Sequence, residues 1–283
     1  MNIQRQAVLL SFIATLIVGF FLARMLIGIK FEHPTLHADH PEALYKEYEQ
    51  MLETYATPRG INYEALSKDI LYEKVYGFFA YQGPQTSPEL FPTDADALAY
   101  DINAYNALMR IALSRHWPLD SPFDIAGPVE LTPGFGIFQG RRFLVDGEKI
   151  TLIKLDERIR NNPAYDARVS LVLACGARSC PYAQAPAFTA ENLDDQLNKT
   201  IRRTLEERRA IEIDHDEEEI RILPIFFLYQ EAIETWLHER GEDIEFRDWL
   251  IDQSPDPTLL RTLLDQGYSL DAQEMDWEID RAE

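Results

Sequence analysis

Residues that bind metal ions are scarce in this sequence. It holds only two cysteines, Cys175 and Cys180, and three of its six histidines fall in the short segment 31–44. Two cysteines at this spacing, without a second Cys or His pair, fall short of the four ligands that a structural zinc ion requires. We therefore expect no metal site and no cofactor.

Basic residues are also few. The 27 Lys and Arg residues stand against 48 Asp and Glu residues, which gives a formal net charge of −21. A field of this sign repels the phosphates of nucleic acids. We expect no nucleic-acid partner, and the acidic surface serves either solubility or contact with a protein partner.

The first thirty residues differ from the rest in being almost entirely apolar. AVLLSFIATLIVGFFLA, residues 7–23, is an uninterrupted apolar run, and MLIGI extends it past Arg24. Together they reach the roughly 20 residues that cross a bilayer as a helix. No small-x-small cleavage site follows, so the segment predicts an uncleaved anchor that tethers the chain to the membrane. We expect the remainder to lie outside the cytoplasm, which is the periplasm if the source is a diderm bacterium.

The remaining sequence mixes helical and strand patterns. Apolar residues recur at helical spacing in 42–55 and 97–116, and a helix opened by Pro224 is expected over 225–240. Two hairpins are expected, over 141–152 with an Asp-Gly turn and over 210–223. These elements predict an α+β fold, with a central antiparallel or mixed sheet and packed helices.

Between the two hairpins lies VSLVLAC, residues 169–175, which is apolar almost throughout. Such a run is typical of a central strand that is covered on both faces. Cys175 is therefore expected at the end of a buried strand, where a side chain can project into a crevice.

Several segments resemble, in this order, the family called domain of unknown function DUF 547. Their sequences are DINAYNAL, FLVDGEKITL, DERIR, DARVSLVLACGARSCP, ENLDDQL and LPIFFLY. The resemblance covers roughly residues 45–250. With the apolar run and the acidic end, the sequence predicts four parts: an anchor, a linker, a family domain and an acidic tail. They span residues 1–30, 31–44, 45–250 and 251–283.

The family's fold is similar to papain-like or transglutaminase-like hydrolases, and a peptidase role has been suspected on that analogy. Where members typically read IEH-x-ILR, this chain reads LDERIR, so that Glu157 stands in the place of the family's His. If that His acts as a base in other members, this chain lacks it. A second difference follows Tyr229, where QEAI replaces the usual Asp-Phe.

Three interpretations of the cysteines remain open from the sequence. Cys175 is a nucleophile activated by Arg178, or it forms a disulfide with Cys180, or both cysteines are buried apolar side chains. A nucleophile also needs a base, and His116 is the best candidate imidazole outside the linker. A His at the end of a helix also commonly caps the last carbonyls.

Two amides are predicted inside the buried helix 97–116. Asn103 and Asn106 must find hydrogen-bond partners there, so they either fix a neighbouring loop or line a pocket. We place them, with Glu157, as candidate pocket-lining residues near the cysteines.

Two functions from different classes follow. The first is a cysteine-dependent hydrolase or acyl transferase that acts on peptide or amide bonds, with Cys175, Arg178, Cys180 and His116 as site residues. The second is a non-catalytic binding or assembly subunit of a membrane-associated complex, which uses the acidic tail 251–283 as its contact surface.

Overall fold

The computed structural model describes residues 30–34, 44–57, 60–125, 134–181, 186–207 and 209–282. The predicted membrane anchor lies outside these residues. Within the ranges given, no helix is long and apolar enough to cross a membrane.

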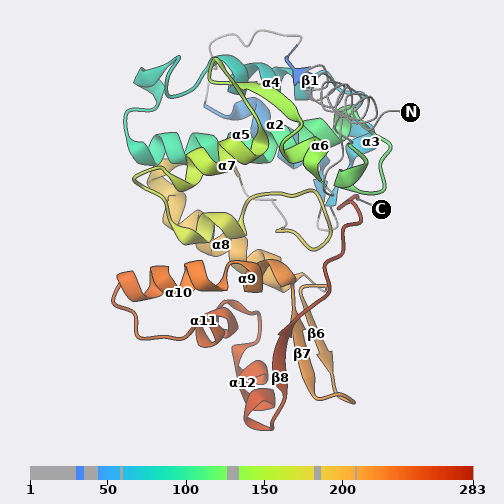
Figure 1. The fold of residues 1–283 in the computed structure, drawn as a ribbon, viewed down its shortest axis with the longest axis vertical. Helices are drawn as coiled ribbons and strands as arrows, with labels where there is room; N and C mark the ends of the chain where they lie inside the picture. Colours follow the sequence, from blue (N-terminus) through green and yellow to red (C-terminus); the bar gives the residue numbers. More distant parts are fainter. Residues whose placement is uncertain are drawn as a thin grey trace, which may run out of the picture.

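One long helix occupies the middle of the fold. Helix α5 (Asp94–Arg115) begins at a capping box in which Thr93 and Asp96 satisfy each other's backbone N–H groups. Residues 98–114 of the helix are buried without interruption. It packs against α3, α4 and α7, which surround it in the upper part of the molecule (Figure 1). The helix predicted over 97–116 is confirmed.

The described residues form three small sheets. In the first, β4 (Arg141–Val145) and β5 (Glu148–Ile150) form the predicted hairpin, and β1 (Lys30–Glu32) pairs parallel to β4. The turn needs a positive φ at both central residues, which Asp146 and Gly147 adopt.

The second sheet is at the opposite end of the molecule (Figure 1). It contains the other predicted hairpin, β6 (Ile211–Asp214) and β7 (Glu219–Ile222), to which β8 (Ser269–Ala272) adds a parallel strand. A third, minimal sheet pairs β2 (Ala56–Thr57) with β3 (Gly60–Ile61).

The other helices cover the core or support the second sheet. In chain order they are α2 (Lys46–Tyr55), α3 (Tyr63–Leu66), α4 (Leu71–Tyr81), α6 (Phe135–Phe138), α7 (Leu152–Arg160), α8 (Leu193–Glu206), α9 (Pro224–Leu228), α10 (Gln230–Glu239), α11 (Phe246–Gln253) and α12 (Pro257–Asp265). Short 3₁₀ turns occur at Pro88–Leu90, Pro122–Asp124, Ala167–Leu171 and Ala190–Asn192.

The central strand predicted over VSLVLAC is wrong. Residues Ala167–Leu171 form a 3₁₀ turn instead, with the Asp166 side chain accepting a hydrogen bond from the backbone N–H of Arg168. The turn is buried because it contacts α8 and α10, which cover it in place of neighbouring strands. An apolar run shows that a segment is buried, and it does not distinguish a strand from a helical turn.

The α+β class is confirmed, while the central sheet is wrong. In the part of the chain that the structure describes, the sheets have two or three strands each and stand apart from one another. Helix α5 takes the central position, and residues 98–114 are buried on every side of it, including the polar residues Asn103 and Asn106. One predicted helix, 225–240, is divided at Tyr229 into α9 and α10.

Candidate functional site

Both cysteines of the chain are joined in one disulfide. The Cα atoms of Cys175 and Cys180 lie 5.8 Å apart, within the range that an unstrained bridge allows. Cys180 is almost fully buried, whereas Cys175 is partly exposed. Neither sulfur is a thiolate in this state, so the structure selects the disulfide among the three interpretations.

The residues between the cysteines form a short loop that requires glycine at its start. Gly176 has φ +77, a conformation that other residues rarely adopt. A Cβ atom at this position would also lie 2.4 Å from a methyl carbon of Leu113 on α5. The loop 176–179 therefore lies directly against the central helix, and we call it the cysteine loop.

The cysteine loop pairs with the end of the chain. Residues 276–282, which we call the C-terminal strap, run back from β8 to the upper part of the molecule (Figure 1). The N–H of Arg178 donates to the carbonyl of Glu278 (2.8 Å), and the N–H of Asp280 donates to the carbonyl of Gly176 (3.1 Å). An antiparallel bridge joins Ala177 to Ile279.

The strap has a second backbone neighbour, Ile61. The N–H of Ile61 donates to the carbonyl of Asp280 (2.8 Å), and the N–H of Ala282 donates to the carbonyl of Ile61 (3.0 Å). Ile61 and Arg281 form a parallel bridge. The strap turns at Asp280, where the N–H of Arg281 donates to the carbonyl of Ile279 (2.9 Å). It is therefore held by isolated bridges to two segments that are far apart in sequence.

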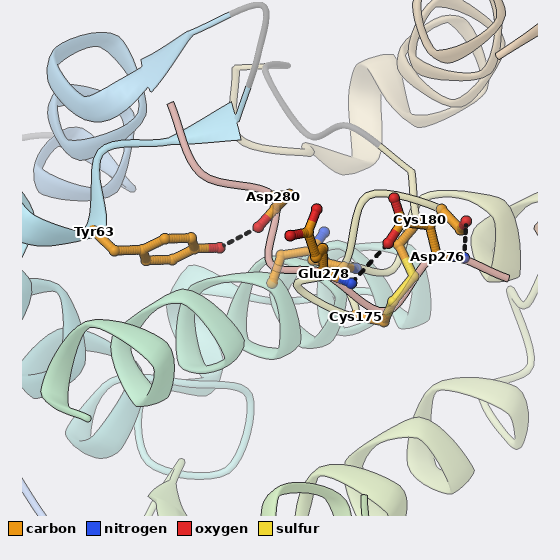
Figure 2. The surroundings of a disulfide bond; sticks show 9 residues. Tyr63, Cys175, Cys180, Asp276, Glu278 and Asp280 are labelled. Atoms are coloured by element: carbon orange, nitrogen blue, oxygen red, sulfur yellow. Dashed lines mark hydrogen bonds between the residues drawn. A yellow bond between two sulfur atoms is a disulfide. The ribbon is translucent and has the colours of Figure 1, made fainter. Parts of the chain in front are cut away.

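Three strap side chains are anchored in the domain. The ring of Trp277 packs on Phe123, with 4.4 Å between ring centroids. Ile279 is 2% exposed, and the hydroxyl of Tyr63 donates to the Asp280 carboxylate at 2.7 Å, as Figure 2 shows. The ring of Trp277, the aliphatic side chain of Ile279 and the carboxylate of Asp280 are therefore each fixed by contacts with the rest of the domain.

The Arg178 side chain is directed toward the acidic residues of the strap. Its guanidinium forms an ion pair with Glu278, and it lies 3.8 Å from a carboxylate oxygen of Asp276. Burial raises the pKa of Asp280 to about 6, although the hydrogen bond from Tyr63 acts in the opposite direction. Arg178 is therefore occupied in fastening the strap.

His116, the candidate base, has its ring nitrogens directed elsewhere. Nδ1 lies 2.8 Å from the carbonyl oxygen of Ala112, and Nε2 lies 3.7 Å from a carboxylate oxygen of Glu32. As the C-cap of α5, this imidazole satisfies a carbonyl of the last turn.

Asn103 and Asn106 use their amides to hold backbone. The side chain of Asn103 exchanges two hydrogen bonds with the backbone of Phe188, at 2.8 and 2.9 Å. That of Asn106 donates to the carbonyl of Val172 (3.1 Å) and accepts from the N–H of Ala174 (2.6 Å). Both residues fix loops, which is one of the two roles that the sequence left open.

Glu157 is exposed on α7. Its carboxylate accepts a hydrogen bond from Lys154 at 2.5 Å. It lines a shallow hollow of about 430 Å³ together with neighbouring residues of β4, β5 and α7, and no residue of the cysteine loop belongs to this hollow. The structure therefore does not bring Glu157 to the cysteines.

A different hollow adjoins the cysteine loop. It has a volume of about 490 Å³, and Arg178, Ser179 and Asp276 form one wall of it. The other lining residues are Arg209, Glu212, Arg221, Leu223, Ala272, Gln273 and Glu274. Within the ranges that the structure describes, no group of three or more His, Cys, Asp or Glu residues could hold a metal ion.

The strap residues were not recognised as part of a site from the sequence. DWEID, residues 276–280, alternates apolar and acidic residues, and this period of two is typical of a half-buried strand. The signal is short, and the acidic composition of 251–283 led us to expect a contact surface for a partner rather than a segment packed on the domain.

Comparison with known proteins gives one family and no activity. Residues 91–204 match the model of a family described as "Protein of unknown function, DUF547". This confirms the resemblance for the central part of the predicted domain, including the cysteine loop. No curated protein and no solved structure matches the chain, so the papain-like or transglutaminase-like fold stays a prediction.

Proposed function

We propose that the protein is a non-catalytic binding domain, held at the membrane by residues 1–30 and facing an extracytoplasmic compartment. The observation that carries the proposal is the Cys175–Cys180 disulfide, whose loop is covered by the C-terminal strap. The disulfide fixes the shape of the cysteine loop, and the backbone hydrogen bonds to the strap hold the loop in place. Together they provide a rigid surface for recognition.

Three requirements of a thiol enzyme speak against catalysis in this state. A nucleophilic cysteine must be a thiolate, and Cys175 is bonded to Cys180. It needs a base within hydrogen-bond reach, and the nitrogens of His116 face Ala112 and Glu32. Its activating cation would be Arg178, which is paired with the strap.

The same bond supports the proposed compartment. Disulfides persist in oxidising environments such as the periplasm and are rare in the cytosol. The disulfide thus supports the predicted orientation, in which the amino terminus is cytoplasmic and the domain lies outside. Carbonate washing of membranes is expected to leave the full-length protein bound, and its release would contradict an anchor.

A thiol hydrolase or acyl transferase acting on peptide or amide bonds is the second candidate. It is favoured by the unequal exposure of the two sulfurs: Cys175 is partly exposed, while Cys180 is 3% exposed. After reduction, Cys175 would be the thiol that solvent and substrate reach.

The two candidates differ in how symmetrically the cysteines behave. Replacing either cysteine breaks the same structural bridge. In cells that lack the gene, the Cys175→Ser and Cys180→Ser variants are therefore expected to correct the resulting defect to the same extent. A catalytic thiol would make Cys175→Ser far worse than its matched control, Cys180→Ser. That asymmetry, with turnover of amide substrates by the reduced protein, would overturn the binding proposal.

A further inference from the structure

We propose that the hollow formed by β4, β5 and α7 holds the phosphate group of an anionic lipid in the membrane to which the chain is anchored. We call it the basic hollow, and its charged lining residues are given below. The inference rests on the anchor in the function proposed above and deepens it, because it specifies which surface of the domain faces the membrane.

The basic hollow carries positive charge in a chain of net charge −21. It has a volume of about 430 Å³, and four cations and two carboxylates line it, namely Arg142, Lys149, Lys154, Arg158, Glu148 and Glu157. Lys154 is paired with Glu157. Among the described residues, no carboxylate forms an ion pair with Arg142 or Lys149. These two cations are therefore available to an anion from outside.

Arg158 is held in place with one nitrogen left over. Its Nε and Nη2 atoms donate to the buried carboxylate of Asp101 at 3.0 and 2.6 Å. Its Nη1 atom is buried without a hydrogen-bond partner, and it lies 3.6 Å from a carboxylate oxygen of Glu148, too far for a hydrogen bond. Buried donors are nearly always paired, so this nitrogen indicates an oxygen ligand that the protein itself does not supply.

An exposed aromatic ring lies beside the cations of the first sheet. Arg142 is exposed on β4, and Phe31 on β1 is its register partner, so that their side chains share one face. The Phe31 ring is 37% exposed, and the ammonium of Lys149 lies 4.3 Å from its centroid. Aromatic rings and long cationic side chains are the groups that favour the boundary between headgroups and water.

The sequence places this face close to the bilayer. The last apolar residue of the proposed anchor is Ile29, and β1 begins at Lys30. The headgroup layer outside the hydrocarbon core is about 5–7 Å thick. A strand that begins directly after a spanning segment therefore begins within this layer or at its edge, and β4, which carries Arg142, is its immediate neighbour.

Screening makes the local charge decisive. At physiological ionic strength the interaction between exposed charges falls off over about 8 Å. Headgroups next to β1 are therefore attracted by the cations of the basic hollow, while the acidic surface elsewhere on the chain is screened from them. This asymmetry orients the domain with its basic face toward the membrane.

A lipid phosphate is favoured over a dissolved phosphate ion as the occupant. The bilayer holds its headgroups at the level of β1, so their concentration near the basic hollow is high. A dissolved anion must instead approach a chain of net charge −21 from solution.

Native mass spectrometry of the full-length protein in a neutral detergent tests the proposal. Phosphatidylglycerol, phosphatidylcholine and inorganic phosphate are titrated separately, and the bound fraction of each is read from the mass. The test variant carries Arg142→Glu and Lys149→Glu. The matched control carries Lys199→Glu and Arg247→Glu, which change the net charge equally at exposed positions of α8 and α11.

We expect phosphatidylglycerol to bind at least about tenfold more tightly than phosphatidylcholine, and the test variant to lose at least about tenfold in affinity for it. The control should keep its affinity, and inorganic phosphate should bind far more weakly than the lipid. A second variant with Arg142→Gln and Lys149→Gln should change in the same direction as the test variant, and it serves where the Glu variant does not fold.

Equal binding of the two lipids, or equal losses in the test and control variants, would overturn the proposal. Inorganic phosphate that binds as tightly as phosphatidylglycerol would assign the basic hollow to a dissolved anion and also overturn it. Carbonate washing separates this inference from the anchor: release of the protein would end both, whereas retention without a lipid preference would end only the inference. Cysteine-dependent turnover would end the non-catalytic function and leave lipid binding unchanged.

Discussion

Two neighbouring loops, residues 172–174 and the cysteine loop 176–179, are held in place from opposite directions. Residues 172–174 are pinned from inside by the Asn106 amide, which projects from the buried helix α5. The cysteine loop, only a few residues later, is closed by the disulfide and covered from outside by the strap. One attachment belongs to the core, and the other belongs to the end of the chain.

The two attachments differ in how easily they can open on their own. Asn106 is 1% exposed, so its hydrogen bonds break only when the core around α5 opens. The strap lies at the surface, and Ile279 is buried while the other residues of 276–282 are half-buried or exposed. Segments with few buried contacts open locally at a lower free energy than the global one. The backbone amides of Ala174 and Arg178 report on the two attachments separately.

Removing the inside attachment should have the largest effect. Asn106→Ala leaves the carbonyl of Val172 and the N–H of Ala174 buried without partners, which is expected to lower the free energy of unfolding by about 3 kcal/mol. Urea unfolding measures the change. The control is Asn192→Ala, at an exposed asparagine, and equal losses in the two variants would contradict the distinction.

The outside attachment should depend on pH. Burial raises the pKa of Asp280 from the ordinary 3.8 to about 6, so the docked strap keeps this proton to a higher pH than the free strap does. Docking is therefore strongest below pH 4 and weakens as the pH rises to 6, by on the order of 2 kcal/mol.

Hydrogen exchange of the Arg178 amide measures this dependence, after correction for the intrinsic exchange rate. Burial also raises the pKa of Asp101 to about 6, and that group acts on the core around α5. Asp280→Asn should therefore remove the pH dependence of hydrogen exchange at the Arg178 amide. The pH dependence of exchange at the Ala174 amide should remain. Unchanged behaviour at Arg178 would show that Asp280 does not control docking.

Reduction of the disulfide sharpens the comparison further. Closing so short a loop stabilises the folded state by about 2 kcal/mol in the chain-entropy account. Cys175→Ser combined with Cys180→Ser should lose this amount and speed exchange at Arg178 more than at Ala174, because Asn106 still holds the latter. Equal acceleration at both amides would mean that the loops open together.

The smallest effect is expected from the ion pair. The Arg178 side chain is 34% exposed, so its pairing with Glu278 is screened by water and contributes about 0.5 kcal/mol. Arg178→Ala should therefore speed exchange at the strap amides about twofold. Arg240→Ala, which removes an exposed pair with Glu242 elsewhere, is the matched control and should leave them unchanged.

The elements predicted most accurately from sequence were those with a local cause. The hairpin turn at Asp146-Gly147 was predictable because only a few residue types adopt two successive positive φ angles. Helix α5 was predictable from its spacing of apolar residues and from Pro118 after its end. The need of Asn103 and Asn106 for partners also followed from burial alone.

The site was less predictable because its parts meet only in the folded chain. Cys175 and Cys180 were identified, but nothing in a five-residue spacing distinguishes a bridge from a nucleophile. Arg178 was assigned to the cysteine, while its charge partner lies a hundred residues later in Glu278. Tyr63 was not considered, since an isolated tyrosine near a helix carries no sign of a distant carboxylate.

The sequence by itself therefore determined the α+β class, the two hairpins, the buried central helix and the segment that contains the cysteines. Their causes are periodicity, turn stereochemistry and the burial of apolar side chains, all of which act over a few neighbouring residues. The tertiary structure was needed to show that VSLVLAC begins in a 3₁₀ turn instead of forming a strand, and that the acidic segment 276–282 returns to the cysteine loop. Long-range pairing of Ile61, the cysteine loop and the strap depends on how distant backbone edges meet, which no local pattern records.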